Sequence, residues 1–283
     1  MPSRWQVRGG TLSNADHTLV MGVLNVTPDS FSDGGLFLDS AAAIERGLGM
    51  WSAGADIIDV GGESTRPGSD PVPADVESGR VIPVIEALSA AGAVISVDTA
   101  KASVAAAAIE AGAAIVNDVT SLGDPEMAAV VAATGAGLVL MHMQGAPDTM
   151  QAAPHYDDVV AEVTDYLATR SAVAVEAGIA EDAICLDPGI GFGKSLEHNL
   201  RLLDDGVRSL AATGRPVLVG ASRKSFLEKI LGPIPPQERD VASAAAHGAA
   251  ITVGAALIRV HNVVEGLRAA RIVDAIVRAD GGV

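Results

Sequence analysis

Polar side chains with complementary chemistry stand directly after several short apolar runs of this sequence. Asp98, Asn117 and Asp187 provide two carboxylates and an amide. Such groups can exchange several hydrogen bonds with the edge of a planar heterocycle. A second group provides positive charge, which suits phosphate or carboxylate; its members are Arg66, Lys224, Arg259 and His261. We therefore expect a ligand with a polar ring at one end and negative charge at the other.

Each of these residues also has an ordinary structural interpretation. An aspartate after a strand commonly caps the next helix, and an asparagine there is often a turn residue. Convergence of several such residues on one rim favours a site, and Arg259 and His261, two apart on a strand, point the same way. His142, Lys194 and Arg223 remain open between structural and functional roles. Residues 235–240 read as a solvated loop and helix start.

The elements that must position these residues recur along the chain. Eight short runs are continuously apolar, which is typical of strands buried on both faces; they span 19–24, 56–60, 94–97, 115–117, 138–141, 184–186, 217–220 and 257–260. Ala-rich stretches with helical spacing lie between them, among them 40–53, 74–90, 101–111, 157–177, 196–212 and 239–253. Eight such units predict a TIM (β/α)₈ barrel, with functional residues at the carboxyl ends of the strands.

An open doubly wound sheet is the competing fold, but the absence of a composition break or linker favours a closed barrel in a single domain. We assign residues 19–283 to the barrel and residues 1–18 to an N-terminal extension. Within the extension, residues 5–12 could form a strand or hairpin that closes the barrel floor.

The composition excludes several other classes of protein. With 283 residues, 49% hydrophobic and 19% charged, the chain is neither disordered nor a coiled coil. A formal net charge of −16 argues against nucleic-acid binding. The single cysteine, Cys185, cannot form an intrachain disulfide and reads as a buried small residue. The sequence has no secretory signal and no apolar run near the roughly 20 residues that span a bilayer. We expect a soluble, cytoplasmic protein with no membrane partner.

Two segments closely resemble the signatures of the dihydropteroate synthase family. They are MGVLNVTPDSFSDGG at 21–35 and DVGGESTRPG at 59–68. Further matching motifs follow in order, namely SVDT at 96–99, ND at 117–118, MHM at 141–143, DPGIGFGK at 187–194, SRKSF at 222–226 and RVH at 259–261. The family is a TIM barrel and a transferase of folate biosynthesis. It joins 6-hydroxymethyl-7,8-dihydropterin diphosphate to p-aminobenzoate, which gives 7,8-dihydropteroate and diphosphate. The resemblance also implies Mg²⁺ as cofactor and a homodimer.

The resemblance implies a role for each motif residue. The pterin would contact Asp98, Asn117, Met141, Asp187, Lys224 and Arg259. The diphosphate would contact Asn25, Thr65, Arg66, Arg259 and His261, with Asn25 also the metal ligand. The p-aminobenzoate would contact Pro67, Phe192 and Ser225. Residues 27–36 would close over the site as a lid, and the residues closest to the chemistry would be Phe31, Asp33, Arg66 and Lys224.

Two other functions compete with this interpretation. A pterin-binding methyltransferase of the methyltetrahydrofolate type resembles the barrel and its pterin contacts, but it would leave the loop at 27–35 and the SRKS motif without a purpose. A non-catalytic paralogue would have lost motif residues, whereas Asp33, Arg66, Lys224 and His261 are all present. With no insertion beside Thr65, Phe192 or Ser225, we expect sulfonamides, which imitate p-aminobenzoate, to inhibit the enzyme.

Overall fold

The computed structural model describes residues 3–27, 35–64, 71–145 and 149–279. Eight parallel strands form one sheet in the order β8-β7-β6-β5-β4-β3-β10-β9. Their bounds are β3 Leu19–Asn25, β4 Ile57–Gly61, β5 Ile95–Asp98, β6 Ile115–Asp118, β7 Gly137–Met141, β8 Ile184–Asp187, β9 Leu218–Val219 and β10 Leu257–Val260. The two edges of the sheet meet where Leu186 bridges Val217 and donates its N–H to the Pro216 carbonyl at 2.9 Å. The predicted TIM barrel is confirmed.

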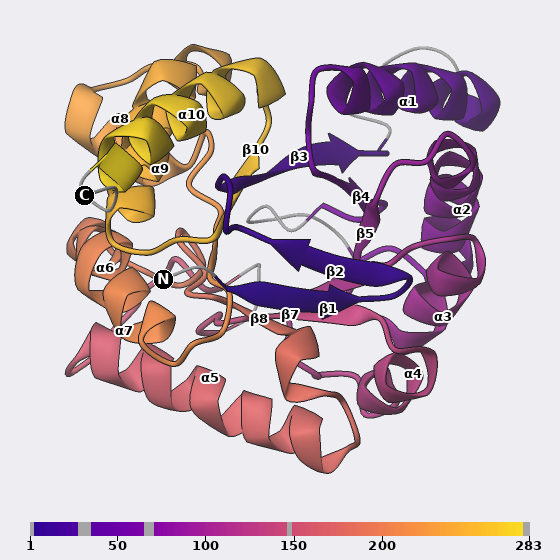
Figure 1. The fold of residues 1–283 in the computed structure, drawn as a ribbon, viewed down its shortest axis with the longest axis horizontal. Helices are drawn as coiled ribbons and strands as arrows, with labels where there is room; N and C mark the ends of the chain where they lie inside the picture. Colours follow the sequence, from indigo (N-terminus) through magenta and orange to yellow (C-terminus); the bar gives the residue numbers. More distant parts are fainter. Residues whose placement is uncertain (1–2, 28–34, 65–70, 146–148, 280–283) are drawn as a thin grey trace.

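A ring of helices surrounds the strands (Figure 1). The helices are α1 Gly35–Ser52, α2 Ala74–Ala90, α3 Ala102–Glu110, α4 Met127–Thr134, α5 Val159–Glu176, α6 Leu196–Arg201, α7 Val207–Ala211, α8 Ser225–Leu231, α9 Asp240–Thr252 and α10 Val263–Ala279. A π-turn, η3 (Leu202–Gly206), joins α6 to α7, and 3₁₀ turns η2 (Glu181–Ala183) and η4 (Pro236–Arg239) precede β8 and α9. Outward-facing strand residues such as Val20, Ile58 and Val97 are fully buried under the helices.

The barrel interior has an apolar floor. Alternate residues of a strand share one face, and inward residues near the start of the strands, such as Met21, Ile57 and Cys185, form one buried cluster. Trp5 of the N-terminal hairpin joins this cluster from below. Burial raises the pKa of the Cys185 thiol, as expected for a packed rather than a reactive cysteine.

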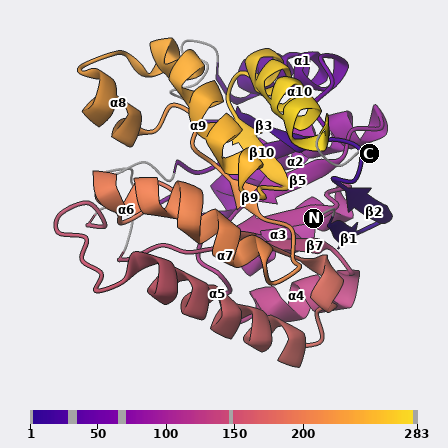
Figure 2. The same cartoon turned by 60° about the vertical axis from the view of Figure 1, so that its left-hand side comes forward.

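The N-terminal hairpin closes the floor. Strands β1 (Arg4–Val7) and β2 (Gly10–Ser13) pair antiparallel across one end of the barrel (Figure 1). Trp5 is almost fully buried, and its indole Nε1 donates to the Ala183 carbonyl at 2.8 Å. Seen from the side, the hairpin lies at one end of the molecule and α8 at the other (Figure 2). Among the described residues, no helix is long and apolar enough to cross a membrane.

Candidate functional site

The alternation that builds the floor also brings the predicted polar residues into the mouth of the barrel. Those that lie on or directly after a strand are an even number of residues beyond an inward floor residue, so their side chains take the same inward direction; they are Asn25, Asp98, Asn117, Asp187, Arg259 and His261. The strand register then sets Asn25 beside Gly61, Gly61 beside Asp98, and Asp98 beside Asn117. Met141 similarly pairs with Asp187. The inward face therefore changes from apolar at the floor to polar at the mouth.

An arginine and two aspartates link three strands at the centre of this polar layer. Arg259 Nε donates to Asp59 Oδ2 at 2.6 Å, and its Nη2 donates to Asp98 Oδ2 at 2.7 Å. Asn117 Nδ2 also donates to Asp59 Oδ2, at 3.0 Å. The second oxygen of Asp59 is buried without a hydrogen-bond partner among the described residues. Asp59 thus leaves one acceptor available at the base of the mouth.

Asp59 was not among the predicted site residues. Its signal in the sequence resembles that of Asp98: an aspartate within a buried apolar run, in the inward register, although Asp59 lies in the middle of β4 and Asp98 ends β5. A helix-capping aspartate at this place has the same local pattern, and only the contact with Arg259, 200 residues away, distinguishes the two.

Burial raises the pKa values of the two predicted pterin-binding carboxyls. The pKa of Asp98 rises to about 7, chiefly because burial disfavours the charged form, although Arg259 opposes the shift. Burial also raises the pKa of Asp187, opposed by the Gly189 N–H, which donates to Asp187 Oδ1 at 2.7 Å. Asp98 is therefore an acceptor whose charge is sensitive to pH near neutrality.

Two loops at the rim bring Phe192 and Lys224 together. Lys224 Nζ lies 3.8 Å from the centroid of the Phe192 ring, a cation–π contact. Ser225, the first residue of α8, is exposed at the same rim. His261 follows β10, and its Nδ1 lies 3.1 Å from Ser222 Oγ. Predicted residues from three loops are thus assembled around one opening.

The buried pair Lys194 and His142 anchors the loop that follows β8. Lys194 Nζ donates to the carbonyls of Phe192 at 2.9 Å and His142 at 3.2 Å, and it lies 3.0 Å from His142 Nδ1. Burial lowers the pKa of Lys194 to about 7 and that of His142 to about 3. His142 is therefore neutral, with Nδ1 accepting from Lys194. Both residues act here as structural supports for the loop that carries Phe192.

The segment at 235–240 is the predicted exposed loop and helix start over residues 235–238, which are exposed, whereas Arg239 and Asp240 are shielded. Arg239 is 6% exposed and donates to the Ile234 carbonyl, and Asp240 pairs with Arg223 at 2.7 Å. The composition of the segment suggests exposure, but long-range contacts bury part of it.

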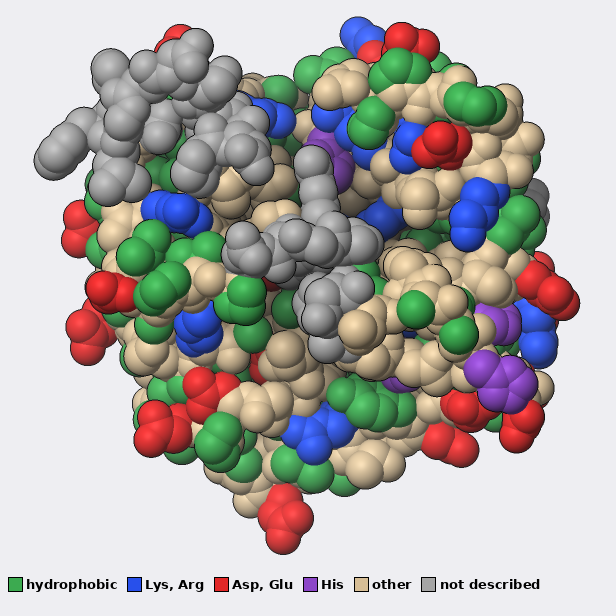
Figure 3. Space-filling view, turned by 180° about the vertical axis from the view of Figure 1, so that it is seen from behind, with side chains coloured by type: hydrophobic (Ala, Val, Ile, Leu, Met, Phe, Trp, Pro, Cys, Tyr) green, Lys and Arg blue, Asp and Glu red, His purple; other side chains and the backbone are tan. Residues whose placement is uncertain are grey.

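Five predicted residues lie outside the described residues, so no contact is assigned to them: Phe31, Asp33, Thr65, Arg66 and Pro67. Most of the predicted lid at 27–36 lies outside them too. Figure 3 views the face opposite the hairpin, on which blue and purple side chains of Lys, Arg and His lie around the centre. Positive charge therefore gathers at the mouth despite the acidic net charge of the chain.

Comparisons with known proteins agree with this geometry. The sequence profile of the family described as "Pterin binding enzyme" matches residues 21–261. Dihydropteroate synthase from Escherichia coli strain K12 is 48% identical over 271 residues, 95% of each chain, and that from Mycobacterium leprae is 45% identical, covering 92% of this chain and 94% of the relative. The structure of Xanthomonas albilineans dihydropteroate synthase with 4-aminobenzoic acid superposes with a TM-score of 0.90 at 45% identity, covering 98% of both chains. The chain belongs to the dihydropteroate synthase family of pterin-binding enzymes.

Proposed function

We propose that the mouth of this barrel joins 6-hydroxymethyl-7,8-dihydropterin diphosphate to p-aminobenzoate, releasing 7,8-dihydropteroate and diphosphate. The observation that carries the proposal is the inward layer of Asp98, Asn117 and Asp187 above an apolar floor, with cations at the rim. A related enzyme from Xanthomonas albilineans, 43% identical with a TM-score of 0.85, binds 7,8-dihydropteroate in its structure, which supports the same substrate class here.

The inward layer matches the hydrogen-bonding edge of a pterin. Carboxylates of Asp98 and Asp187 can accept from the ring N–H and amino groups, and Asn117 can both donate and accept. Met141, buried beside Asp187, offers an apolar contact for the ring. A ring without the donor edge would leave buried carboxylates unpaired, which is a strong basis for rejection. Arg259 belongs to the same layer, because its guanidinium is held by Asp59 and Asp98.

The rim suits p-aminobenzoate. Its aromatic ring can pack against Phe192, and its carboxylate can be bound by the hydroxyl of Ser225. The Lys224 ammonium already lies over the Phe192 ring, so the apolar and charged contacts are adjacent. The pterin end and the arylamine end of the product would thus lie in the barrel and at its rim respectively.

The residues fit a Mg²⁺ ion that is shared with the substrate. No group of three His, Cys, Asp or Glu side chains capable of holding a metal occurs among the described residues. Asn25 nevertheless presents an amide oxygen into the mouth, where Gly61 leaves space: a Cβ there would lie 3.7 Å from Asn25 Oδ1. Mg²⁺ commonly combines one or two protein oxygens with substrate phosphates and water. Bound in this way, the ion would neutralise charge on the departing diphosphate.

The chemistry then needs little from the protein beyond positioning and charge. The C–O bond to diphosphate breaks before or during attack by the arylamine, because the dihydropterin can delocalise positive charge on its methylene carbon. Arg259 in the polar layer and His261 after β10 would stabilise the negative charge of the diphosphate. A general base is not required, since an aniline nitrogen is unprotonated at neutral pH.

We also propose that the enzyme acts as a homodimer. An apolar groove runs between α6, α8 and α9, and it is lined on both sides by residues such as Leu203, Phe226, Ile230 and Ala246. Ile230 and Leu231 expose more than half of their surface beside it, which is costly in water unless a partner covers them. Light scattering of the wild type and of Ile230→Asp tests this: the variant should shift the mass towards the monomer. The cytoplasmic location expected from the sequence stays a prediction.

The experiment that tests the reaction is diphosphate release with the dihydropterin diphosphate and Mg²⁺, with and without p-aminobenzoate. Release should require both substrates and Mg²⁺, and it should be lost in Asp187→Ala and Lys224→Ala. Asp165→Ala and Lys229→Ala change the same residue types at exposed positions on α5 and α8, so they should retain activity. Pterin binding without diphosphate release would instead favour a methyltransferase or a non-catalytic paralogue.

A further inference from the structure

Arg223, which lies between two rim residues, has an unusual backbone conformation. Its φ is 59°, and it is one of three described non-glycine residues with positive φ. A bulky residue in this region costs about 1–3 kcal/mol and persists only when its surroundings hold it there. Ser222, on one side, contacts His261, and Lys224, on the other, contacts Phe192. The conformation of Arg223 therefore sets the directions of two side chains at the opening.

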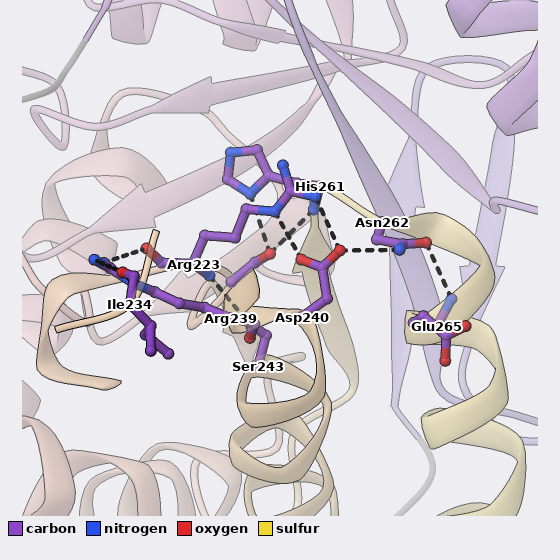
Figure 4. Close-up of polar contacts among 9 residues, drawn as sticks. Arg223, Ile234, Arg239, Asp240, Ser243, His261, Asn262 and Glu265 are labelled. Atoms are coloured by element: carbon purple, nitrogen blue, oxygen red, sulfur yellow. Dashed lines mark hydrogen bonds and ion pairs between the residues drawn. The ribbon is translucent and has the colours of Figure 1, made fainter. Parts of the chain in front are cut away.

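The segment formed by η4 and the start of α9 holds Arg223 at every polar group (Figure 4). The Arg223 N–H donates to Ser243 Oγ at 2.9 Å, and its carbonyl accepts from Arg239 Nη1 at 3.2 Å. Its guanidinium forms a two-pronged contact with Asp240, Nε to Oδ1 at 2.7 Å and Nη2 to Oδ2 at 2.9 Å. Bidentate arginine–carboxylate pairs fix orientation as well as distance. Asp240 is thus the group that fixes the Arg223 side chain.

Asp240 also binds the loop that follows β10. Its Oδ2 accepts from Asn262 Nδ2 at 3.0 Å, and Asn262 is the residue after His261. The two loops have a second link, since the His261 N–H donates to Ser222 Oγ at 3.2 Å. One carboxylate therefore joins the loop of Lys224 and Ser225 to the loop of His261.

The ion pair between Arg223 and Asp240 is maintained at neutral pH, because Asp240 stays charged there. The Arg223 guanidinium and the Asn262 amide lower the pKa of Asp240. The side chains of Arg223 and Asp240 are 22% and 17% exposed, so the pair is largely shielded from water. A shielded, two-pronged ion pair contributes more to geometry than an exposed one.

We propose that Asp240 is a positioning residue for the condensation, which fixes the arylamine-binding loop relative to the diphosphate-binding loop through Arg223 and Asn262. Asp240 does not contact substrate; it acts through these two neighbours. The inference rests on the proposed function, since it concerns where p-aminobenzoate lies when diphosphate leaves.

The role has a chemical consequence that a general loss of stability would not produce. When the C–O bond breaks, its electron pair leaves with diphosphate, and the methylene carbon is captured. Capture by the arylamine forms the C–N bond and releases a proton from nitrogen. Capture by water forms a C–O bond, releases a proton and returns the hydroxymethyl dihydropterin. If the arylamine is displaced, water captures a larger share of the methylene carbon. The amount of diphosphate released then exceeds the amount of dihydropteroate formed.

The test compares Asp240→Asn with a matched control at the other end of the barrel. Asp274 of α10 is also shielded, and it accepts from the N–H and the hydroxyl of Thr18, both at 2.7 Å. Asp274→Asn makes the same chemical change beside the floor. The molar ratio of diphosphate released to dihydropteroate formed does not depend on the fraction of folded protein, so it separates positioning from stability.

Asp240→Asn should raise this ratio from near one to about two or more, and raise KM for p-aminobenzoate roughly tenfold, given the sensitivity of catalysis to displacements near 1 Å. Arg223→Lys, which keeps the charge but loses the planar fork, should shift both quantities in the same direction. The double variant should be no worse than the worse single variant, because both act through one contact. Asp274→Asn should lower Tm and leave the ratio at one.

A ratio of one with an unchanged KM in Asp240→Asn would overturn the proposal, as would an equal change in Asp274→Asn. If Asp240→Asn does not accumulate as folded protein, Arg223→Lys carries the same test. A wild-type enzyme that forms no dihydropteroate would refute the proposed function instead, and the two failures are thereby distinguished.

Discussion

Adding one methyl group at Gly189 should impair both stability and activity. Gly189 lies two residues after Asp187, and its N–H donates to Asp187 Oδ1 at 2.7 Å. Its φ is +68°, and a Cβ there would lie only 1.9 Å from the His142 carbonyl oxygen. The substitution Gly189→Ala therefore combines an unfavourable backbone angle with a collision against backbone, which cannot rotate away.

A second glycine separates these two effects. Gly135 ends α4 with a φ of +67°, and a Cβ there meets nothing within 4 Å. Gly135→Ala should therefore lower the free energy of unfolding only by the cost of placing a non-glycine residue in the left-handed region, about 1–2 kcal/mol. At Gly189 the loop must also move about 1.5 Å to restore an ordinary contact. Overpacking of this kind adds about 1–3 kcal/mol.

The movement should also affect catalysis. Lys194 binds both the His142 and Phe192 carbonyls, so the loop cannot move without disturbing its own anchor. A displacement of Asp187 near 1 Å should reduce kcat/KM about 100-fold, while Gly135→Ala should leave kcat/KM unchanged.

The assays are urea denaturation of both variants, with the free energy of unfolding extrapolated to water, and initial rates of dihydropteroate formation. The reasoning is refuted if Gly189→Ala costs no more than Gly135→Ala and keeps wild-type kcat/KM. A loss of stability without a loss of activity would show that the loop yields on the side away from Asp187.

Four further predictions follow from the site. Because burial raises the pKa of Asp98 to about 7, its charged form predominates only above that pH; kcat/KM for the pterin substrate should fall up to tenfold per unit as pH drops below 7, and a pH–rate profile that is flat from 5 to 8 would contradict this. In the window between 3.8 and about 7, the folded state retains a proton that the unfolded state has released, so the contribution of Asp98 to the free energy of unfolding should fall as pH rises. Lys194→Met leaves one buried and one partly buried carbonyl without this donor, and it should lower the free energy of unfolding by about 3 kcal/mol in urea denaturation; a loss below 1 kcal/mol would argue against the anchoring role. Sulfonamides should inhibit competitively with p-aminobenzoate, as the complex of a 44% identical Yersinia pestis enzyme with a sulfonamide drug suggests, and undiminished turnover in excess drug would exclude this.

The strands were the most predictable part of the fold. All eight predicted runs coincide with strands within a few residues, because strands buried on both faces are apolar without interruption. Helix α2 was predicted with its observed bounds, Ala74–Ala90. The segment at 196–212 was predicted as one helix, but it contains the wider turn η3. Its apolar spacing over five residues does not distinguish a π-turn from an α-turn.

The site was predictable where it depends on the strands. Asp98, Asn117 and Asp187 end strands in the inward register, so local pattern and fold together bring them to the mouth. Asp240 was not predictable, because its role depends on Arg223 and Asn262, which are 17 and 22 positions away in the chain. No local pattern separates such an aspartate from one at the exposed start of a helix.

The floor hairpin constrains how the enzyme is made on the ribosome. Trp5 is synthesised before its hydrogen-bond acceptor, Ala183, which follows 178 residues later. At the usual rates of translation, about 10–40 s pass between the synthesis of Trp5 and that of Ala183. During that interval the Trp5 indole lacks its hydrogen-bond acceptor, and Trp5 and Val7 can pack only against the parts of the barrel floor that have already been synthesised. The hairpin is thus synthesised long before the last part of the floor to which it binds, so its docking is complete only when the chain has reached Ala183.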